Sequence, residues 1–295
     1  MRLANVKGRA VLVRGEGAAD IHEISGGRFG PHPQRVFDDW ERFRSWTEEL
    51  DEAPEFKAYS LSDLGPPSPN PRQVFAVALN YKSHADESKI SYPEHPAIFT
   101  KFPTCIAGPY DDIVLTGKTV DWEVEVVAVI GHRITDVEPD AAWSAVAGLT
   151  VGQDISERTV QLRPPIPQFS LGKSFRSFGP TGPLLVTADE LADPADLELG
   201  CNVNGINVQR SSTKRMLFSV PQLVSHLSKV VTLLPGDLIF TGTPDGVGIA
   251  RKPKWYLQGG DTLESYVTGI GTMINKCSQP VSSSASTQLE EVPLR

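Results

Sequence analysis

Two glutamates alternate with apolar residues in the segment VDWEVEVVAVIG at 120–131. In a β-strand, side chains two positions apart point the same way, so Glu123 and Glu125 share one face while Trp122 and Val124 occupy the other. Beyond Glu125 the segment is apolar on both faces, which is typical of an internal strand. Two neighbouring carboxylates repel each other and lose hydration there, so a cation, a shared proton or exposure to water must compensate. A half-exposed strand whose outer face carries two acids is the alternative that this pattern leaves open.

A third carboxylate, Asp154 in VGQDISERTVQ, follows another apolar segment. Three carboxylates plus water suit a hard cation with oxygen ligands, Mg²⁺ or Mn²⁺ before Zn²⁺. An Asp two residues before a Ser is equally typical of a turn or an N-cap. Glu123, Glu125 and Asp154 together form a candidate metal site.

His84 and Glu87, in LNYKSHADESK, are three residues apart and share a face if this segment is helical. A carboxylate that holds an imidazole makes a general base, able to take a proton from water. An exposed polar helix turn is the alternative interpretation. The polarity of the segment and the following Pro93 and Pro96 favour a mobile loop of the kind that a lid needs.

Two further segments combine glycine with polar residues. LGKSFRSFGPTGP contains Lys173 but lacks the two-glycine spacing of a nucleotide-binding P-loop, so it does not predict phosphate binding. TGTPDGVG at 241–248 follows the apolar DLIF segment. Its backbone N–H groups and hydroxyls are suited to an anion, although the pattern of an ordinary turn is the same.

Composition excludes several classes of function. The net charge of −8 argues against a nucleic-acid-binding protein, which usually carries a basic stripe. No apolar run approaches the roughly 20 residues of a membrane span, and the N-terminal residues lack the apolar stretch of a secretory signal. The three cysteines are odd in number and far apart, which fits neither a disulfide framework nor a zinc cluster. A cytoplasmic protein without a membrane or nucleic-acid partner is expected.

The pattern of segments predicts a β-dominated α+β fold. Residues 1–68 are expected to form a small N-terminal domain and linker, with a strand at RAVLV and a helix from about 38 to 49. Residues 69–279 are rich in strand-like runs, with helix candidates at 141–151 and 220–230, and strands that do not alternate regularly with helices. The Ser-rich stretch at 280–295 has little to bury and is expected to be a disordered tail.

In order, these segments resemble the fumarylacetoacetate hydrolase superfamily, over about residues 74–275. The matching pattern runs LNYxxHAxE, IFTKFPT, VDWEVEVVAVIG, GQDISERTVQ, LGKSF, VNG, PGDLIFTGTPDGVG and a final GD-LE-G-G-N stretch. The resemblance implies a mixed β-sandwich roll as the catalytic domain, and a homodimer.

The resemblance also implies roles for individual residues. Its metal ligands fall on Glu123, Glu125 and Asp154, holding Mg²⁺ or Mn²⁺, with Ca²⁺ as a substitute in crystals. The remaining positions are a catalytic His84–Glu87 pair and Lys173, and the substrate-binding residues Arg158, Gln161 and Thr243. A further acid of the eukaryotic namesake falls on Asn80, and Asp245 stands where a small residue is frequent, which predicts a different substrate tail.

The activity that the resemblance implies is hydrolysis of a carbon–carbon bond in a small-molecule 2,4-dioxo acid of acylpyruvate or fumarylpyruvate type. In it, His84 and Glu87 activate water while the cation and Lys173 stabilise the departing enolate. Decarboxylation of an oxaloacetate-like acid and isomerisation of a 2-hydroxy-diene-dioate are alternatives on the same metal site. A non-catalytic ligand-binding relative is an alternative of another class.

Overall fold

The computed structural model describes residues 1–50 and 54–280. The N-terminal region contributes β1 (Arg2–Val6), β2 (Arg9–Arg14), β3 (Gly17–Asp20), α1 (Ile21–Ile24), α2 (Trp40–Glu48), β4 (Lys57–Ala58) and β5 (Leu64–Gly65). The helices that follow are α3 (Lys82–Ser88), α4 (Arg158–Gln161), α5 (Phe169–Gly172) and α6 (Val220–Ser228). The strands that follow are β6 (Val74–Ala78), β7 (Ala97–Thr100), β8 (Ile106–Ala107), β9 (Ile113–Val114), β10 (Val120–Asp121), β11 (Val124–Ile130), β12 (Val146–Gln153), β13 (Ser156–Glu157), β14 (Gly179–Val186), β15 (Glu198–Val203), β16 (Ile206–Ser212), β17 (Leu238–Phe240), β18 (Thr262–Val267) and β19 (Gly271–Ser278).

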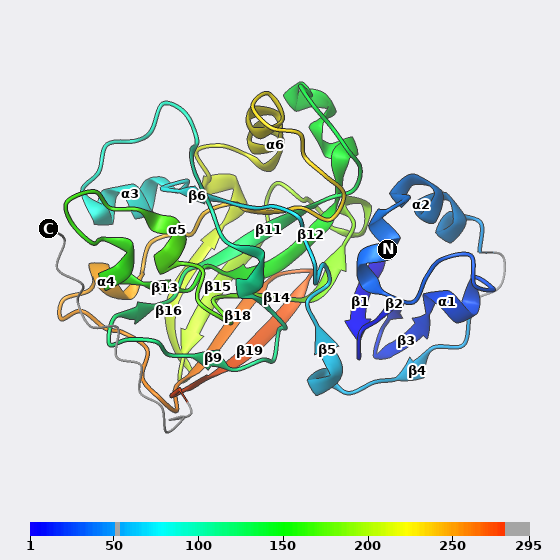
Figure 1. The fold of residues 1–295 in the computed structure, drawn as a ribbon, viewed down its shortest axis with the longest axis horizontal. Coiled ribbons are helices and arrows are strands. Elements are labelled where there is room, and N and C mark those ends of the chain that lie inside the picture. Colours follow the sequence, from blue (N-terminus) through cyan, green and yellow to red (C-terminus); the bar gives the residue numbers. More distant parts are fainter. Residues whose placement is uncertain (51–53, 281–295) are drawn as a thin grey trace, which may run out of the picture.

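Two large sheets pack face to face. The larger runs in the order β4-β3-β2-β1-β14-β12-β11-β17-β6-β7, and the smaller in the order β16-β15-β18-β19-β9. In Figure 1, β15, β18 and β19 lie against β11, β12 and β14. Most neighbouring strands are antiparallel, but β6 and β17 are parallel. This mixed sandwich with few helices confirms the predicted β-dominated α+β fold.

The central strand β11 is apolar on both faces because both faces are covered. Ala128 lies in the core between the two sheets, whereas Val127 belongs to a second cluster that includes the aromatic side chains of the N-terminal region. Glu123 and Glu125 are separated from Val127 by even numbers of residues, so in an extended strand they point to the same, second face. They lie beyond the end of the apolar stripe on that face. β11 pairs with β12 on one side and β17 on the other, which confirms the predicted internal position.

The N-terminal region continues the larger sheet. β1 pairs with β14 in an antiparallel register that aligns Leu3 with Leu185. The predicted helix near 38–49 is confirmed as α2, whose buried face includes Phe43 and Trp46. Figure 1 shows this region at one end of the molecule, with α3, α4 and α5 at the other. The division of the chain into domains near residue 68 stays a prediction.

One predicted helix is wrong. Pro139–Ala145 forms a 3-10 helix, and the following Val146–Gln153 forms strand β12 instead of continuing as a helix. β12 lies between β11 and β14, so its residues are buried on both faces. A short apolar run of this kind is compatible with a central strand or a buried helix, and its periodicity cannot separate the two. The predicted helix at 220–230 is confirmed as α6.

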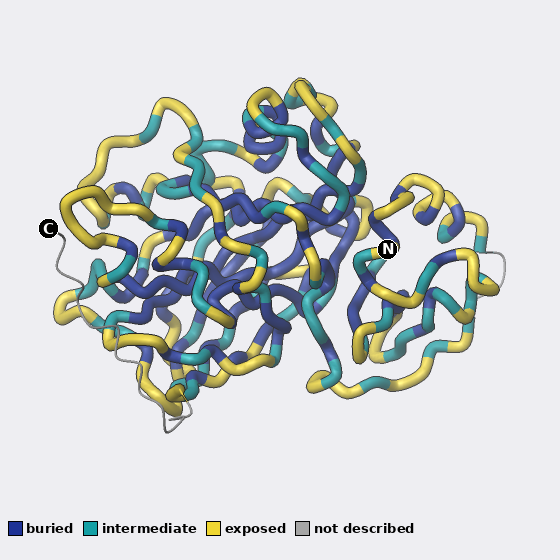
Figure 2. Tube along the Cα trace, in the orientation of Figure 1, coloured by how far each residue is buried: buried dark blue, intermediate teal, exposed yellow. Residues whose placement is uncertain are grey.

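Burial follows the two sheets, and exposed residues gather in the loops (Figure 2). Among residues 1–50 and 54–280, no helix combines the length and apolar character that crossing a membrane requires. The predicted tail at 280–295 lies outside the described residues, apart from Pro280.

Candidate active site

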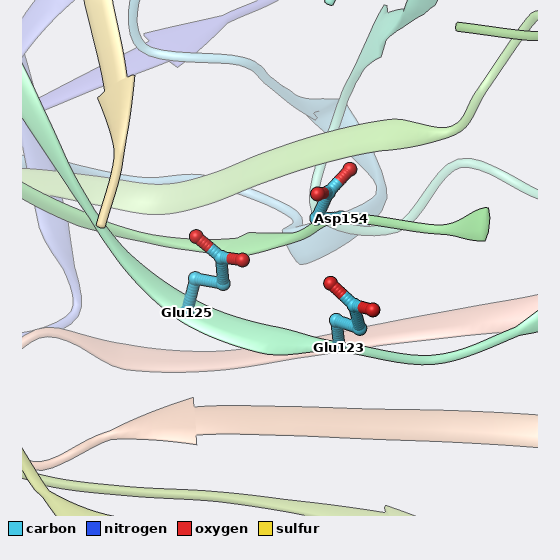
Figure 3. A group of neighbouring side chains, drawn as sticks. All are labelled: Glu123, Glu125 and Asp154. Atoms are coloured by element: carbon cyan, nitrogen blue, oxygen red, sulfur yellow. The ribbon is translucent and has the colours of Figure 1, made fainter. Parts of the chain in front are cut away.

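Three carboxylates meet at the beginning of β11. Glu125 lies in β11, Glu123 immediately precedes it, and Asp154 immediately follows the neighbouring β12. The backbone N–H of Asp154 donates to the Glu123 carbonyl at 2.9 Å, which fixes the two residues side by side. One oxygen of each carboxylate lies within 4.8 Å of the others, and all three side chains are buried. Figure 3 shows Glu123 and Glu125 rising from the same side of one strand, with Asp154 beside them.

Two buried lysines neutralise part of this charge. Lys173 Nζ donates to Glu123 Oε2 at 2.8 Å, to Asp154 Oδ2 at 2.7 Å and to Ser156 Oγ at 2.8 Å. Lys101 Nζ donates to Asp154 Oδ1 at 2.7 Å and to two backbone carbonyls. An ammonium group has three protons to donate, so each lysine has all of its donors engaged. Burial alone would lower the pKa of Lys101, but Asp154, together with Cys105 and Glu125, more than offsets it, and the pKa is raised.

Arg158 is the third buried cation of the cluster. Its Nη1 lies 2.7 Å from Glu123 Oε1 and donates to Gln161 Oε1 at 2.9 Å. Its Nε donates to Asp121 Oδ2, also at 2.9 Å. Asp121 is itself fully buried and accepts two further bonds from the backbone N–H groups of Gly248 and Ile249. Arg158 is therefore held between two acids, and Asp121 links it to the loop that follows β17.

Glu125 is the acid whose charge is left uncompensated. Burial opposes ionisation of both glutamates, but Lys173 and Arg158 outweigh it at Glu123 and lower its pKa to about 2. At Glu125, burial and the charges of Asp154 and Glu123 raise the pKa well above its ordinary value. Within the described parts of the chain, Glu125 makes no ion pair, and it accepts a bond from the Gly242 N–H at 2.7 Å. An all-oxygen donor set with one unbalanced carboxylate fits a hard divalent cation.

His84 and Glu87 form a hydrogen-bonded pair on α3. His84 Nδ1 lies 2.7 Å from Glu87 Oε1, as their spacing predicted. A carboxylate accepts but does not donate, so Nδ1 carries the proton and Nε2 of the neutral ring has a free lone pair. The other oxygen, Glu87 Oε2, accepts from the backbone N–H of Gly246 at 2.9 Å. The pair is therefore anchored to the loop after β17, and its free nitrogen has the chemistry of a base.

A cavity of about 590 Å³ joins these groups. Its walls include the predicted residues His84, Glu87, Glu123, Arg158, Gln161, Lys173 and Thr243. Glu125 and Asp154 lie next to Glu123, below the cavity surface. The structure thus brings all nine predicted site residues into one place, while their roles as ligands, catalysts and substrate contacts stay predictions.

Close backbone approaches place two of these residues. A Cβ atom on Gly172 would lie 2.5 Å from the backbone nitrogen of Gln161, so glycine there allows α5 to pack against α4 and bring Lys173 to the acids. Gly242 has a φ of 97°, in the region that favours glycine, and this conformation presents its N–H to Glu125.

Thr243 uses its hydroxyl within the protein. Oγ1 donates to the Val124 carbonyl and accepts from Gln209 Nε2, both at 2.9 Å. Thr243 is predicted to bind substrate, but its hydroxyl could donate to a substrate carboxylate only if the bond to Val124 broke. Gln209 also donates to the Pro244 carbonyl, so it fixes the start of the Gly-rich loop.

Comparison with known proteins decides the family. The sequence pattern of the fumarylacetoacetate (FAA) hydrolase C-terminal family matches residues 73–278. The chain belongs to this family. It is 44% identical over 212 residues, 71% of this chain and 67% of the relative, to the oxaloacetate tautomerase Fahd2a, mitochondrial, of Rattus norvegicus. These matches confirm the resemblance found in the sequence.

Two solved structures extend the likeness to the N-terminal region. A crystal structure of a protein from Mycobacterium smegmatis is 49% identical, with a TM-score of 0.90, and the match covers 95% of this chain and all of that one. Maleylpyruvate hydrolase from Sphingobium sp. SYK-6, solved with manganese(II) and pyruvate, is 29% identical, with a TM-score of 0.77. That match covers 95% of this chain and 99% of the solved one.

The structure places both residues that depart from the fumarylacetoacetate hydrolase pattern. Asn80, at the position of the namesake's additional acid, is fully buried and donates to the carbonyls of Phe218 and Thr241. Its side chain joins two loops, and the cluster keeps three carboxylates. Asp245 is exposed and is not part of the cavity wall, so the expectation that it shapes the substrate's tail finds no support in its position.

The sequence did not single out Lys101 or Asp121. Lys101 lies in IFTKFPT and Asp121 in VDWEVE, both of which carried the family resemblance. The available signal was a charged residue inside an apolar segment, because such a residue is rarely buried without a partner. Identifying the partners, Asp154 and Arg158, requires the fold.

Proposed function

We propose that this protein is a divalent-metal-dependent hydrolase that cleaves the C3–C4 bond of a 2,4-dioxo acid of acylpyruvate or fumarylpyruvate type. The observation that carries the proposal is the His84–Glu87 pair, which presents a basic nitrogen to the same cavity as the carboxylate cluster. Hydrolysis of this kind needs a base for water beside a site that stabilises an enolate. A cavity with both features supports it.

Glu123, Glu125 and Asp154 would hold Mg²⁺ or Mn²⁺, whose charge polarises the 2-oxo acid head and favours the enolate leaving group. Manganese(II) in the solved maleylpyruvate hydrolase supports this choice of ion. Titration calorimetry of the chelator-treated protein with Mg²⁺ and Mn²⁺ measures the affinity. Glu125→Gln is expected to weaken binding strongly, and unchanged affinity in that variant would contradict the assignment.

The side chains of the cavity supply the proton transfers. His84 Nε2 accepts a proton from water, and the water oxygen adds to the C4 carbonyl. The C3–C4 bond then breaks, its electron pair goes to the pyruvate enolate, and the acyl part leaves as a carboxylic acid. His84 returns the proton to C3. Because all three donors of Lys173 are engaged, this lysine contributes its charge near the head, and donates to the substrate only by releasing one of its present partners.

The rat oxaloacetate tautomerase relative favours a second candidate, the keto–enol interconversion of oxaloacetate. The same His84–Glu87 pair would remove a proton from C3 and deliver it to the C2 oxygen. Decarboxylation of an oxaloacetate-like acid and isomerisation of a 2-hydroxy-diene-dioate would draw on the same cluster. All these reactions require a stabilised enolate, and hydrolysis alone also requires an activated water.

A comparison of His84→Ala with His95→Ala tests the proposal. His95 is exposed, near α3 and outside the cavity wall, so it controls for loss of an imidazole. Pyruvate release from an acylpyruvate with Mn²⁺ is expected to fall by about 100-fold or more in His84→Ala and to stay unchanged in His95→Ala. Tautomerisation of oxaloacetate without acylpyruvate cleavage in the wild type would reject hydrolysis and leave the second candidate. Metal binding without turnover of either substrate would indicate the ligand-binding relative.

The predicted homodimer and cytoplasmic location stay proposals. Light scattering during size-exclusion chromatography measures the mass of the assembly and tests the dimer. Fractionation of the source cells tests the cytoplasmic location.

A further inference from the structure

The cavity wall combines polar residues with a larger set of apolar ones. Its polar residues are those of the carboxylate cluster, the His84–Glu87 pair and their neighbours. The apolar residues include side chains from the end of β6 and the residue after it, from β7 and from α5: Val77, Ala78, Leu79, Ala97, Phe99 and Phe169. A substrate whose head lies at the cluster must therefore extend its other end along apolar side chains.

Two aromatic side chains of the wall lie beside the polar residues. Lys173 Nζ lies 5.3 Å from the centre of the Phe99 ring, and the Phe99 and Phe169 rings are 5.6 Å apart in an edge-to-face arrangement. Ile90 and Leu162, both exposed, continue the apolar lining at the rim. Apolar side chains therefore lie both beside Lys173 and at the exposed edge of the cavity.

No free cation lies along this path among the described residues. The lysine and arginine side chains in the cavity wall are Lys173 and Arg158. Lys173 is paired with Glu123 and Asp154. Arg158 is paired with Asp121 at 2.8 Å and with Glu123 at 2.7 Å. A second carboxylate on the substrate would lose hydration here without gaining an ion-pair partner, and this is strongly unfavourable.

The cavity volume also exceeds what the head requires. At roughly 30 Å³ for each water in the liquid, 590 Å³ corresponds to about 20 waters, far more than a pyruvate-sized group displaces. More than half of the lining residues are apolar, so the additional space suits an acyl chain or ring.

From these observations we infer that the substrate carries a single carboxylate, at the 2-oxo acid head, and that its tail beyond C4 is an apolar alkyl or aryl group. This inference rests on the proposed function and narrows it to acylpyruvates with neutral tails. Fumarylpyruvate and maleylpyruvate, which end in a second carboxylate, would be poor substrates.

A pair of substrates of equal shape tests the inference. In 4-methylpentanoylpyruvate the tail ends in an isopropyl group, and in succinylpyruvate a carboxylate replaces it. For the wild-type enzyme with Mn²⁺, kcat/KM for the isopropyl compound is expected to exceed that for the carboxylate compound by at least about 100-fold. Equal values, or a preference for succinylpyruvate, would overturn the inference while leaving hydrolysis established.

If neither compound is cleaved, the proposed function fails and binding decides the inference separately. The probes are 6-methyl-2-oxoheptanoate and 2-oxoadipate, which again differ by an isopropyl group in place of a carboxylate. Calorimetry with the Mn²⁺-loaded protein is expected to show tighter binding of the isopropyl compound by at least about 10-fold. Equal or tighter binding of 2-oxoadipate would overturn the inference.

A charge placed in the apolar wall should weaken the preference for the isopropyl compound. Phe169→Arg adds a guanidinium to the cavity, and Leu171→Arg adds the same charge to the exposed side of the same helix, outside the cavity wall. The ratio of kcat/KM for succinylpyruvate to that for 4-methylpentanoylpyruvate is expected to rise by at least about 10-fold in Phe169→Arg and to stay within about 2-fold in Leu171→Arg. Equal ratios in the two variants would contradict the placement of the tail against Phe169. The wild-type comparison needs no variant, so it decides the inference even if Phe169→Arg fails to fold.

Discussion

Glu87 joins His84 to Gly246: its Oε1 lies 2.7 Å from His84 Nδ1, and its Oε2 accepts the Gly246 N–H at 2.9 Å. The imidazole on α3 is thereby oriented by a loop that is more than 150 residues away in sequence and begins beside the Glu125 contact at Gly242. The same loop thus contacts both the base pair and the carboxylate cluster.

Glu87→Gln should disable the base while preserving the fold. The amide keeps an acceptor for Gly246 but turns an NH₂ group toward Nδ1, which favours the tautomer with its proton on Nε2. We expect kcat for an acylpyruvate to fall by about 100-fold or more, with Mn²⁺ affinity unchanged. Steady-state kinetics measures kcat, and calorimetry measures the Mn²⁺ affinity. Glu94→Gln, an exposed change near the same helix, is the control, and a loss of kcat below about 3-fold in Glu87→Gln would contradict the assigned role.

Lys101→Met should destabilise the protein substantially. The substitution removes the partner of Asp154 Oδ1 and the donor to two buried carbonyls. Breaking a buried ion pair by removing one partner typically costs about 3–5 kcal/mol. Urea unfolding of the chelator-treated protein measures the loss, and Lys118→Met, at an exposed position, should change the free energy of unfolding by less than about 0.5 kcal/mol. A Lys101→Met protein as stable as this control would refute the structural role.

The raised pKa of Glu125 predicts how stability depends on pH without metal. The folded state binds the Glu125 proton more tightly than the unfolded chain, whose value is near 4.5, so this stabilisation is complete below about pH 4.5 and is lost as pH rises toward the folded pKa. Glu123 acts in the opposite direction, because its pKa is lowered to about 2 in the folded state. Its stabilisation is present above about pH 4.5 and is lost as the pH falls toward 2.

Thermal unfolding of wild type and Glu125→Gln in chelator measures this effect. The variant keeps a neutral side chain at every pH, so its Tm should exceed that of the wild type by an amount that grows from about pH 5 to pH 8. Mn²⁺ should raise the Tm of the wild type and leave the variant nearly unchanged. Parallel pH profiles for the two proteins would show that Glu125 is ionised or hydrated in the metal-free state.

Thr243→Val should reduce stability more than substrate affinity. The hydroxyl proton is donated to the Val124 carbonyl, and removing it leaves a buried acceptor unsatisfied, at a cost of about 1–3 kcal/mol. KM for an acylpyruvate should change by less than about 3-fold, and Thr243→Ser should restore both quantities. A KM increase above about 10-fold without loss of stability would show that the hydroxyl contacts the substrate.

Residues related by local periodicity could be predicted from the sequence. The shared face of Glu123 and Glu125 follows from strand alternation, and the His84–Glu87 bond follows from helical spacing. Asp154 could be named as a possible third carboxylate from its residue type, and the family resemblance supported it as a metal ligand. Its place beside Glu123 depends on the strand pairing between β11 and β12.

Tertiary contacts decided what the sequence could not. The apolar run that forms β12 has no periodicity to distinguish a strand from a helix, and its position between β11 and β14 determines the outcome. Lys101 looks like a surface residue until Asp154 is placed next to it. The engaged donors of Lys173 and Thr243 likewise depend on partners from distant segments.

Hydrolysis of an acylpyruvate at a cation held by Glu123, Glu125 and Asp154 requires both the cation and its ligands. Pyruvate release from 4-methylpentanoylpyruvate, measured with Mn²⁺ and with excess EDTA for the wild type and Glu123→Ala, tests this requirement. We expect steady release by the wild type with Mn²⁺, and loss of at least about 100-fold with EDTA or in Glu123→Ala. Release that is unaffected by EDTA and by Glu123→Ala would contradict it.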